Sequence, residues 1–106
     1  SAFWDQQTLG QVNGQLLKIA KGLGKTNWHQ HDDQDEAFLV IRGELIVETE
    51  EGSETLRSQH LHVVPRGVRH RTIAKEEAWF LVIGTDVTST ASGGKPASLQ
   101  VPGEKA

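Results

Sequence analysis

The residues of this 106-residue chain that could do chemistry begin with two histidines, His29 and His31, separated by a single residue. If the segment around them is a β-strand, side chains two positions apart leave on the same face, and both imidazoles can chelate one cation. Glu36 opens the apolar run 37–41, and the short loop before it would return a carboxylate toward the histidines. His70 could supply a further imidazole from a strand far away in sequence. The pattern therefore indicates a metal site.

A second histidine pair, His60 and His62, has the same spacing and leaves an alternative open. On a strand these two side chains would also share a face, and with His70 they would form a rival site of three histidines. Three arginines surround His70 in the sequence: Arg66, Arg69 and Arg71. Either they form a solvated rim that pairs with nearby carboxylates, or one of them faces the cavity and orients an anionic substrate.

Composition and charge narrow the classes of protein to which the chain can belong. Hydrophobic residues make up 36% and charged residues 24%, which is typical of one small globular domain. The formal net charge of −3 gives no basic surplus for nucleic acid. Neither a run of about 20 apolar residues nor a signal-peptide pattern is present, so we expect no membrane partner and a cytoplasmic location. Because the chain has no cysteine, nitrogen and oxygen atoms must hold any metal.

Short apolar segments separated by turn residues predict a fold made of strands. No stretch combines a period of 3.6 residues with helix start and stop signals, so we expect little helix and an all-β sandwich or barrel. Residues 1–14 are predicted to form an N-terminal arm with a turn, 15–84 a β-barrel, and 85–106 an irregular tail rich in Thr, Ser, Gly and Pro. The expected strands are 16–20, 37–41, 44–49, 54–56, 60–64, 68–74 and 79–83.

Two ordered motifs resemble those of the cupin superfamily, and most closely its small single-domain members. The pattern His29-x-His31, four residues, Glu36, six residues, Gly43 resembles the first cupin motif. Pro65-x-Gly67-x-x-His70 resembles the second. The resemblance covers roughly residues 15 to 84, and two motifs in the right order are far more specific than a lone His-x-His.

The resemblance implies a cupin double-stranded β-helix, a jelly-roll-like barrel with a metal in its mouth, commonly assembled as a homodimer. Carried over by position, the metal ligands are His29, His31, Glu36 and His70. One position departs from the pattern, because Gln59 stands where the second motif usually opens with glycine. We therefore expect a different turn before the strand that follows.

Three neutral imidazoles and one carboxylate suit a divalent first-row metal, namely Mn, Fe, Co, Ni, Cu or Zn, and the ligand types do not choose among them. A metal that prefers six ligands would keep two positions for water, dioxygen or a bidentate oxygen substrate. The leading hypothesis is a metalloenzyme that acts on a small oxygen-rich molecule as a dioxygenase, isomerase or lyase.

The alternatives are a non-catalytic cupin that senses a small molecule or stores metal, and a structural cupin with an empty site. The family pattern has ordinary barrel residues at positions 60 and 62. We keep His62, ahead of His60, as a candidate acid–base group or as a residue that supports the metal ligands. Apart from the metal, the sequence names no catalytic residue.

Overall fold

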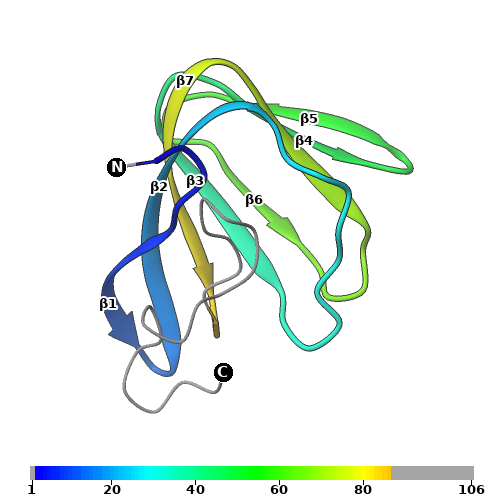
Figure 1. The fold of residues 1–106 in the computed structure, drawn as a ribbon. Helices are drawn as coiled ribbons and strands as arrows, with labels where there is room; N and C mark the ends of the chain where they lie inside the picture. Colours follow the sequence, from blue (N-terminus) through cyan, green and yellow to red (C-terminus); the bar gives the residue numbers. More distant parts are fainter. Residues whose placement is uncertain (1, 87–106) are drawn as a thin grey trace.

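The computed structural model describes residues 2–86, so most of the predicted tail, residues 87–106, lies outside the described part. The described residues form seven strands and no helix (Figure 1). Their bounds are β1 Gln7–Val12, β2 Gln15–Lys25, β3 Glu36–Arg42, β4 Leu45–Thr49, β5 Gly52–Leu56, β6 Leu61–Val64 and β7 His70–Gly84. Within this part of the chain, no helix exists that could cross a membrane. The expectation of an all-β, jelly-roll-like fold is confirmed.

The longest strand, β7, connects two layers of antiparallel strands. Its second half pairs with β2 and β3, which gives the order β1-β2-β7-β3-β6, while its first half pairs with β4 of the β4–β5 hairpin (Figure 1). Among the described residues no pairing joins β5 to β6, so the sheet is not closed by hydrogen bonds along that side. Antiparallel strands that curve around one core give the barrel-like shape expected for a jelly roll.

The prediction of two separate strands, 68–74 and 79–83, was wrong, because β7 runs without a break from His70 to Gly84. The charged link 75–77 is a bulge: between the pairs Gly22–Ala78 and Gly24–Ala74, β7 has three residues where β2 has one. Extra residues on one strand bend it and increase its twist. The link therefore turns β7 from one layer into the other, and its charged side chains stay exposed.

Within the predicted N-terminal arm, Gln7–Val12 forms β1, which pairs with β2. The turn between them consists of Asn13 and Gly14, both at positive φ (50° and 80°), as a two-residue hairpin loop requires. The predicted turn is thus confirmed, whereas the strand before it was not expected. Trp4, which precedes β1, packs its ring against Phe80 and donates its indole N–H to the carbonyl of Leu23.

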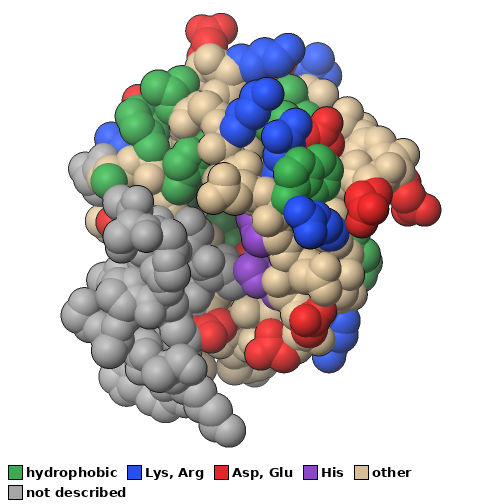
Figure 2. Space-filling model, turned by 45° about the vertical axis from the view of Figure 1, so that its right-hand side comes forward, with side chains coloured by type: hydrophobic (Ala, Val, Ile, Leu, Met, Phe, Trp, Pro, Cys, Tyr) green, Lys and Arg blue, Asp and Glu red, His purple; other side chains and the backbone are tan. Residues whose placement is uncertain are grey.

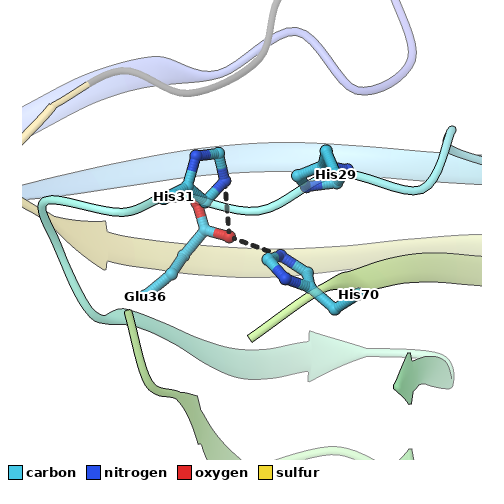
Figure 3. Close-up of side chains that lie close together, drawn as sticks. All are labelled: His29, His31, Glu36 and His70. Atoms are coloured by element: carbon cyan, nitrogen blue, oxygen red, sulfur yellow. Dashed lines mark hydrogen bonds and ion pairs between the residues drawn. The ribbon is translucent and has the colours of Figure 1, made fainter. Parts of the chain in front are cut away.

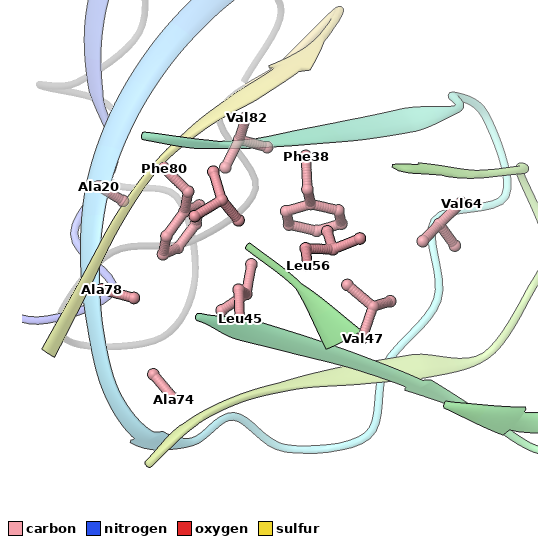
Figure 4. Packing of buried hydrophobic residues seen from close by; sticks show 11 residues of the cluster. Ala20, Phe38, Leu45, Val47, Leu56, Val64, Ala74, Ala78, Phe80 and Val82 are labelled. Atoms are coloured by element: carbon pink, nitrogen blue, oxygen red, sulfur yellow. The ribbon is translucent and has the colours of Figure 1, made fainter. Parts of the chain in front are cut away.

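Aliphatic and aromatic side chains fill the space between the two layers (Figure 4). They come from alternate positions on β2, β3, β4 and β7, as expected for strands with one buried face. Phe38 and Phe80 lie at the centre with their rings 6.2 Å apart. Burying one large apolar side chain stabilises a fold by about 1.5–3 kcal/mol. The cluster consists of Ala20, Phe38, Val40, Leu45, Val47, Leu56, Val64, Ala74, Ala78, Phe80 and Val82.

Candidate metal centre

The segment that carries the histidine pair lies between β2 and β3 and is extended without being a regular strand. Only His29 pairs there, in an isolated bridge with His70. The expectation of a strand around His29 and His31 was therefore wrong in detail, since bends at Asp32 and Asp33 interrupt the pairing. The His29 and His31 rings still lie close together, with their centres 5.1 Å apart.

Backbone and hydroxyl hydrogen bonds fasten this segment to the start of β7. The N–H of Thr26 donates to the carbonyl of Thr72 (3.0 Å), and the N–H of Thr72 donates to the Thr26 hydroxyl (2.9 Å). His29 and His70 then exchange both backbone hydrogen bonds, at 2.9 and 2.8 Å. Further along, the N–H of Gly67 donates to the carbonyl of His31 (2.8 Å). The two sequence motifs are thus held together residue by residue.

Four side chains converge inside this frame: His29, His31, Glu36 and His70 (Figure 3). One potential ligand atom from each lies within 4.8 Å of all the others. The Glu36 Oε1 atom is 3.3 Å from His70 Nε2 and 3.5 Å from His31 Nε2. Glu36 is the first residue of β3 and His70 the first of β7, so strand ends aim both inward. The four residues that the sequence predicted are thus brought together.

Backbone carbonyls set the orientation of two of the imidazoles. His29 Nδ1 lies 2.6 Å from the carbonyl oxygen of Asn27, and His70 Nδ1 lies 2.9 Å from that of Val68. A carbonyl oxygen can only accept, so in both rings Nδ1 carries the proton and donates it. The Nε2 atom is then the one with a free lone pair. Hydrogen bonds of this kind fix the tautomer and direction of histidines that bind metals.

His31 supplies the observation that tests whether a cation fits. Its Nε2 atom is buried and, among the described residues, has no hydrogen-bond partner. A buried polar atom without a partner is costly, and a cation at the centre of the cluster would satisfy it. Metal bonds of about 2.0–2.2 Å place neighbouring ligand atoms about 3.0–3.5 Å apart. The separations of 3.3 and 3.5 Å between Glu36 Oε1 and the two imidazole nitrogens agree with this spacing.

The pKa values of His29 and His70 are shifted in opposite directions. Burial lowers the pKa of His29, and the neighbouring imidazoles of His70 and His31 add to this effect. Burial also lowers the pKa of His70, but the hydrogen bonds to Glu36 and to the Val68 carbonyl, together with the Glu36 charge, outweigh it and raise that pKa above 6.5. Of these two histidines, His70 is therefore the one that keeps its proton to higher pH, beside the Glu36 carboxylate.

The cluster can be reached from solvent. Histidine side chains are visible in a hollow of the molecular surface (Figure 2). His29 and His31 are half-buried, whereas Glu36 and His70 are only 3% and 1% exposed. A small molecule can therefore approach from the side of the histidine pair, while the carboxylate lies deeper.

The second histidine pair lies elsewhere. His62 faces inward on β6 opposite Phe38 and lines a separate pocket of about 340 Å³ between β6 and the β4–β5 hairpin. His60 is exposed, and its Nδ1 accepts the backbone N–H of Arg57 (3.0 Å) in the turn before β6. Within residues 2–86, His60, His62 and His70 do not come together, so the rival three-histidine site is not formed.

Two of the three arginines near His70, Arg66 and Arg71, pair with carboxylates. The side-chain Nε of Arg66 lies 3.4 Å from Asp35, and that of Arg71 lies 2.5 Å from Glu48. Arg69 and Arg71 both lie over the ring of Trp28, at 6.0 and 5.0 Å. The backbone N–H of Arg66 also donates to Asp35 (2.9 Å), and these hydrogen bonds lower the pKa of that carboxyl.

Sequence reasoning missed four buried polar residues: Gln6, Lys18, Gln34 and Thr72. Of these, Lys18 and Gln34 are 0% and 5% exposed. The predicted strand 16–20 includes Lys18, and its alternation with Leu16 and Ala20 places it on their face of β2. Gln34 lies against Gly84, where a Cβ would come within 2.3 Å of its side-chain oxygen, and it accepts the N–H of Thr85. The alternation of inward-facing residues along β2 could have identified Lys18 as buried. No comparable pattern in the sequence indicates that Gln34 is buried.

Comparison with known proteins agrees with this geometry. The sequence matches the family model for the Cupin domain over residues 15–84. The chain belongs to the cupin family. A cupin-2 domain containing protein from Shewanella frigidimarina has 32% identity to this cupin and a TM-score of 0.76, over 78% of this chain and 81% of that one.

Two other proteins resemble this chain to different degrees. The uncharacterized protein YdbB of Bacillus subtilis is 32% identical over 66 residues, which are 61% of this chain and 58% of YdbB. A hydroquinone 1,2-dioxygenase from Sphingomonas, solved with 4-hydroxybenzoate bound, is 18% identical, with a TM-score of 0.67 over 77% of this chain and 65% of that one. At that identity the likeness concerns the fold alone.

Proposed function

We propose that this cupin binds one divalent first-row transition metal through the imidazoles of His29, His31 and His70 and the carboxylate of Glu36. The buried Nε2 atom of His31, which has no hydrogen-bond partner among the described residues, carries this proposal. Glu36 Oε1 lies 3.5 Å from it, beyond the usual length of a hydrogen bond, whereas a cation between the two atoms would bind both. The donor set suits Mn, Fe, Co, Ni, Cu or Zn.

We propose further that the bound metal makes the protein a small metalloenzyme, of the dioxygenase, isomerase or lyase type, for an oxygen-rich substrate. When bound, such a metal supplies Lewis acidity and sites for oxygen ligands. The chain itself contributes the orientation of the imidazoles, the hollow that admits a small molecule, and the apolar wall formed by Phe38, whose ring centre lies 6.4 Å from that of His70. The dioxygenase that shares the fold supports this reading at the level of fold only.

Metal analysis of protein purified without a nickel column tests the proposal. Wild-type protein is expected to carry about one metal ion per chain, and His70→Ala to lower the affinity by more than about 100-fold, because a ligand matters more than the groups that orient it. His60→Ala is the matched control, since this exposed histidine lies outside the cluster. Equal metal content in wild type and His70→Ala would refute the ligand assignment.

The second candidate is a cupin that binds a small molecule or stores metal without turnover. One observation favours it: His62, the acid–base candidate from the sequence, lines a separate pocket and is not part of the cluster described within residues 2–86. Oxygen-uptake and product assays over small sugars and carboxylates, run beside thermal-shift binding, separate the two. Binding without turnover would favour the sensor.

We also propose a cytoplasmic location, which cell fractionation tests.

A further inference from the structure

The barrel is open along one side, between β5 and β6. Among the described residues, β5 pairs with β4 alone and β6 pairs with β3 alone, so each of these strands keeps one edge without a strand partner. The pocket of about 340 Å³ that His62 lines lies between them. Its volume is within the range of pockets that bind small molecules, and none of the four candidate metal ligands lines it.

Two polar side chains of this pocket occupy inner-face positions of their strands. In register, Glu54 on β5 pairs with Val47, and His62 on β6 pairs with Phe38. Val47 and Phe38 are core residues, 1% and 4% exposed (Figure 4). Because directly paired residues place their side chains on the same face of a sheet, Glu54 and His62 point toward the barrel interior. Strands with one buried face normally have apolar residues at such positions.

The other lining residues indicate which chemistry the pocket favours. Val47, Pro65 and Val68 give it an apolar wall, and Glu51 adds a second carboxylate to that of Glu54. Within the described part of the chain, no lysine or arginine lines it. A cleft whose carboxylates are not balanced by cations attracts a positively charged ligand. An apolar wall beside a carboxylate suits a molecule that has an apolar body and one cationic end.

We infer that the pocket between β5 and β6 binds a small organic ammonium ion. Its ammonium group donates to the Glu54 carboxylate, its apolar body lies against Val47 and Val68, and His62 forms the opposite wall. This site is separate from the candidate metal centre, and the inference does not depend on metal binding.

A different role for Glu54 gives the test its second outcome. Inward-pointing charges on a strand with a free edge prevent other chains from pairing with that edge. Such protection needs a charge on β5 but no ligand. It therefore predicts no saturable binding at the pocket, whereas the binding site predicts both saturation and a preference for a cation.

The test compares benzylamine with benzyl alcohol, which have the same ring and nearly the same shape, while only the amine is charged at pH 7. The full chain is kept in EDTA, so that no bound metal can ligate the amine. Methyl NMR signals of Val47 and Val68 and the amide signal of Glu54 report binding at this pocket. We expect saturable shifts and a preference for the amine of about 3- to 5-fold, as an ion pair with an exposed carboxylate provides. High salt should reduce the preference.

Two variants with the same change in net charge identify the carboxylate. Glu54→Gln keeps the shape of the side chain and should remove the preference for the amine. Glu50→Gln is the matched control, because Glu50 is exposed in the turn of the same hairpin and does not line the pocket, and it should keep the preference.

Three outcomes would overturn the inference. Without saturable shifts for either probe in the wild-type protein, the inward charge serves only to protect the edge. Equal affinity of the wild-type protein for both probes would exclude a site selective for ammonium ions, and this result needs no variant to fold. Loss of the preference in Glu50→Gln as well would show that the overall charge of the hairpin, and not Glu54, attracts the amine.

Discussion

At the scale of single residues, the candidate centre depends on how three imidazoles are turned. His29 and His70 each donate Nδ1–H to the carbonyl two residues earlier, and this leaves Nε2 for a cation. Among the described residues, the His31 ring makes no such bond to a carbonyl, and its Nε2 lies 3.5 Å from Glu36 Oε1. Of the three histidines, His31 is therefore the one whose orientation should change most when metal binds.

The opposite pKa shifts of His29 and His70 predict different titrations in the metal-free protein. By NMR of the imidazole protons, His70 should titrate above 6.5 and His29 below it. Glu36→Gln should lower the pKa of His70, because burial remains while the carboxylate charge is lost. Equal titration of both histidines, or a His70 pKa unchanged in Glu36→Gln, would contradict this account.

The same shifts fix the sign of each residue's contribution to stability. For His70 the folded-state pKa is raised, so its contribution is present below pH 6.5 and is lost as the pH rises through the folded value. For His29 the folded-state pKa is lowered, so its contribution is present above pH 6.5 and is lost as the pH falls through the folded value.

Gln59 gives a second prediction at this scale. Its φ of 70° lies in the left-handed region, which glycine adopts without strain, and glycine is the residue expected there from the second cupin motif. Gln59→Gly should therefore raise the free energy of unfolding by about 0.5–1 kcal/mol, measured by urea denaturation. Gln11→Gly, on the exposed strand β1, should lower it instead. A loss of stability in Gln59→Gly would show that the turn imposes no strain.

At the scale of elements, the contact between the histidine segment and β7 decides how well the ligands are held. Thr26 is central, because its hydroxyl accepts the N–H of Thr72 and lies 3.0 Å from the Thr72 hydroxyl. Thr26→Val should leave that N–H unsatisfied, at a cost of about 1–3 kcal/mol, and weaken metal binding about 10-fold. Thr26→Ser should restore both values. Calorimetric titration with Zn²⁺ measures the affinity, and an unchanged value in Thr26→Val would argue against this positioning role.

A feature of these elements could be predicted where residue type and spacing alone specify it, and could not where it depends on contacts between distant strands. His29, His31, Glu36 and His70 could be found because metal chelation constrains both residue type and spacing. The course of β7 could not, because a run of Lys and Glu is typical of a turn, and only pairing with β2 shows it to be a bulge. Lys18 was missed for a related reason: a charge among apolar residues suggests exposure, and tertiary packing overrides that expectation.

At the scale of the whole molecule, the outer face of the larger sheet has two cross-strand rows that are apolar across β2, β7, β3 and β6. The registers align one row across β2, β7, β3 and β6 as Leu17, Ile83, Ala37 and Val63. The adjacent row is Ile19, Leu81, Leu39 and Leu61. All eight side chains are half-buried or exposed, and Leu61 and Val63 are 59% and 50% exposed. A sheet face open to water normally carries polar residues at these positions.

This face predicts a homodimer in which the same two rows of each copy pack against each other about a twofold axis. A flat, uncharged aliphatic surface is complementary to itself, and an isologous contact requires nothing else. Sedimentation of the wild-type protein should give a dimer, and Leu39→Lys, which places a charge at the centre of the face, should give a folded monomer. Leu23→Lys is the control, since Leu23 is exposed at the β7 bulge and outside both rows. A wild-type monomer at high concentration, or a Leu39→Lys dimer, would show that another surface or partner covers these rows.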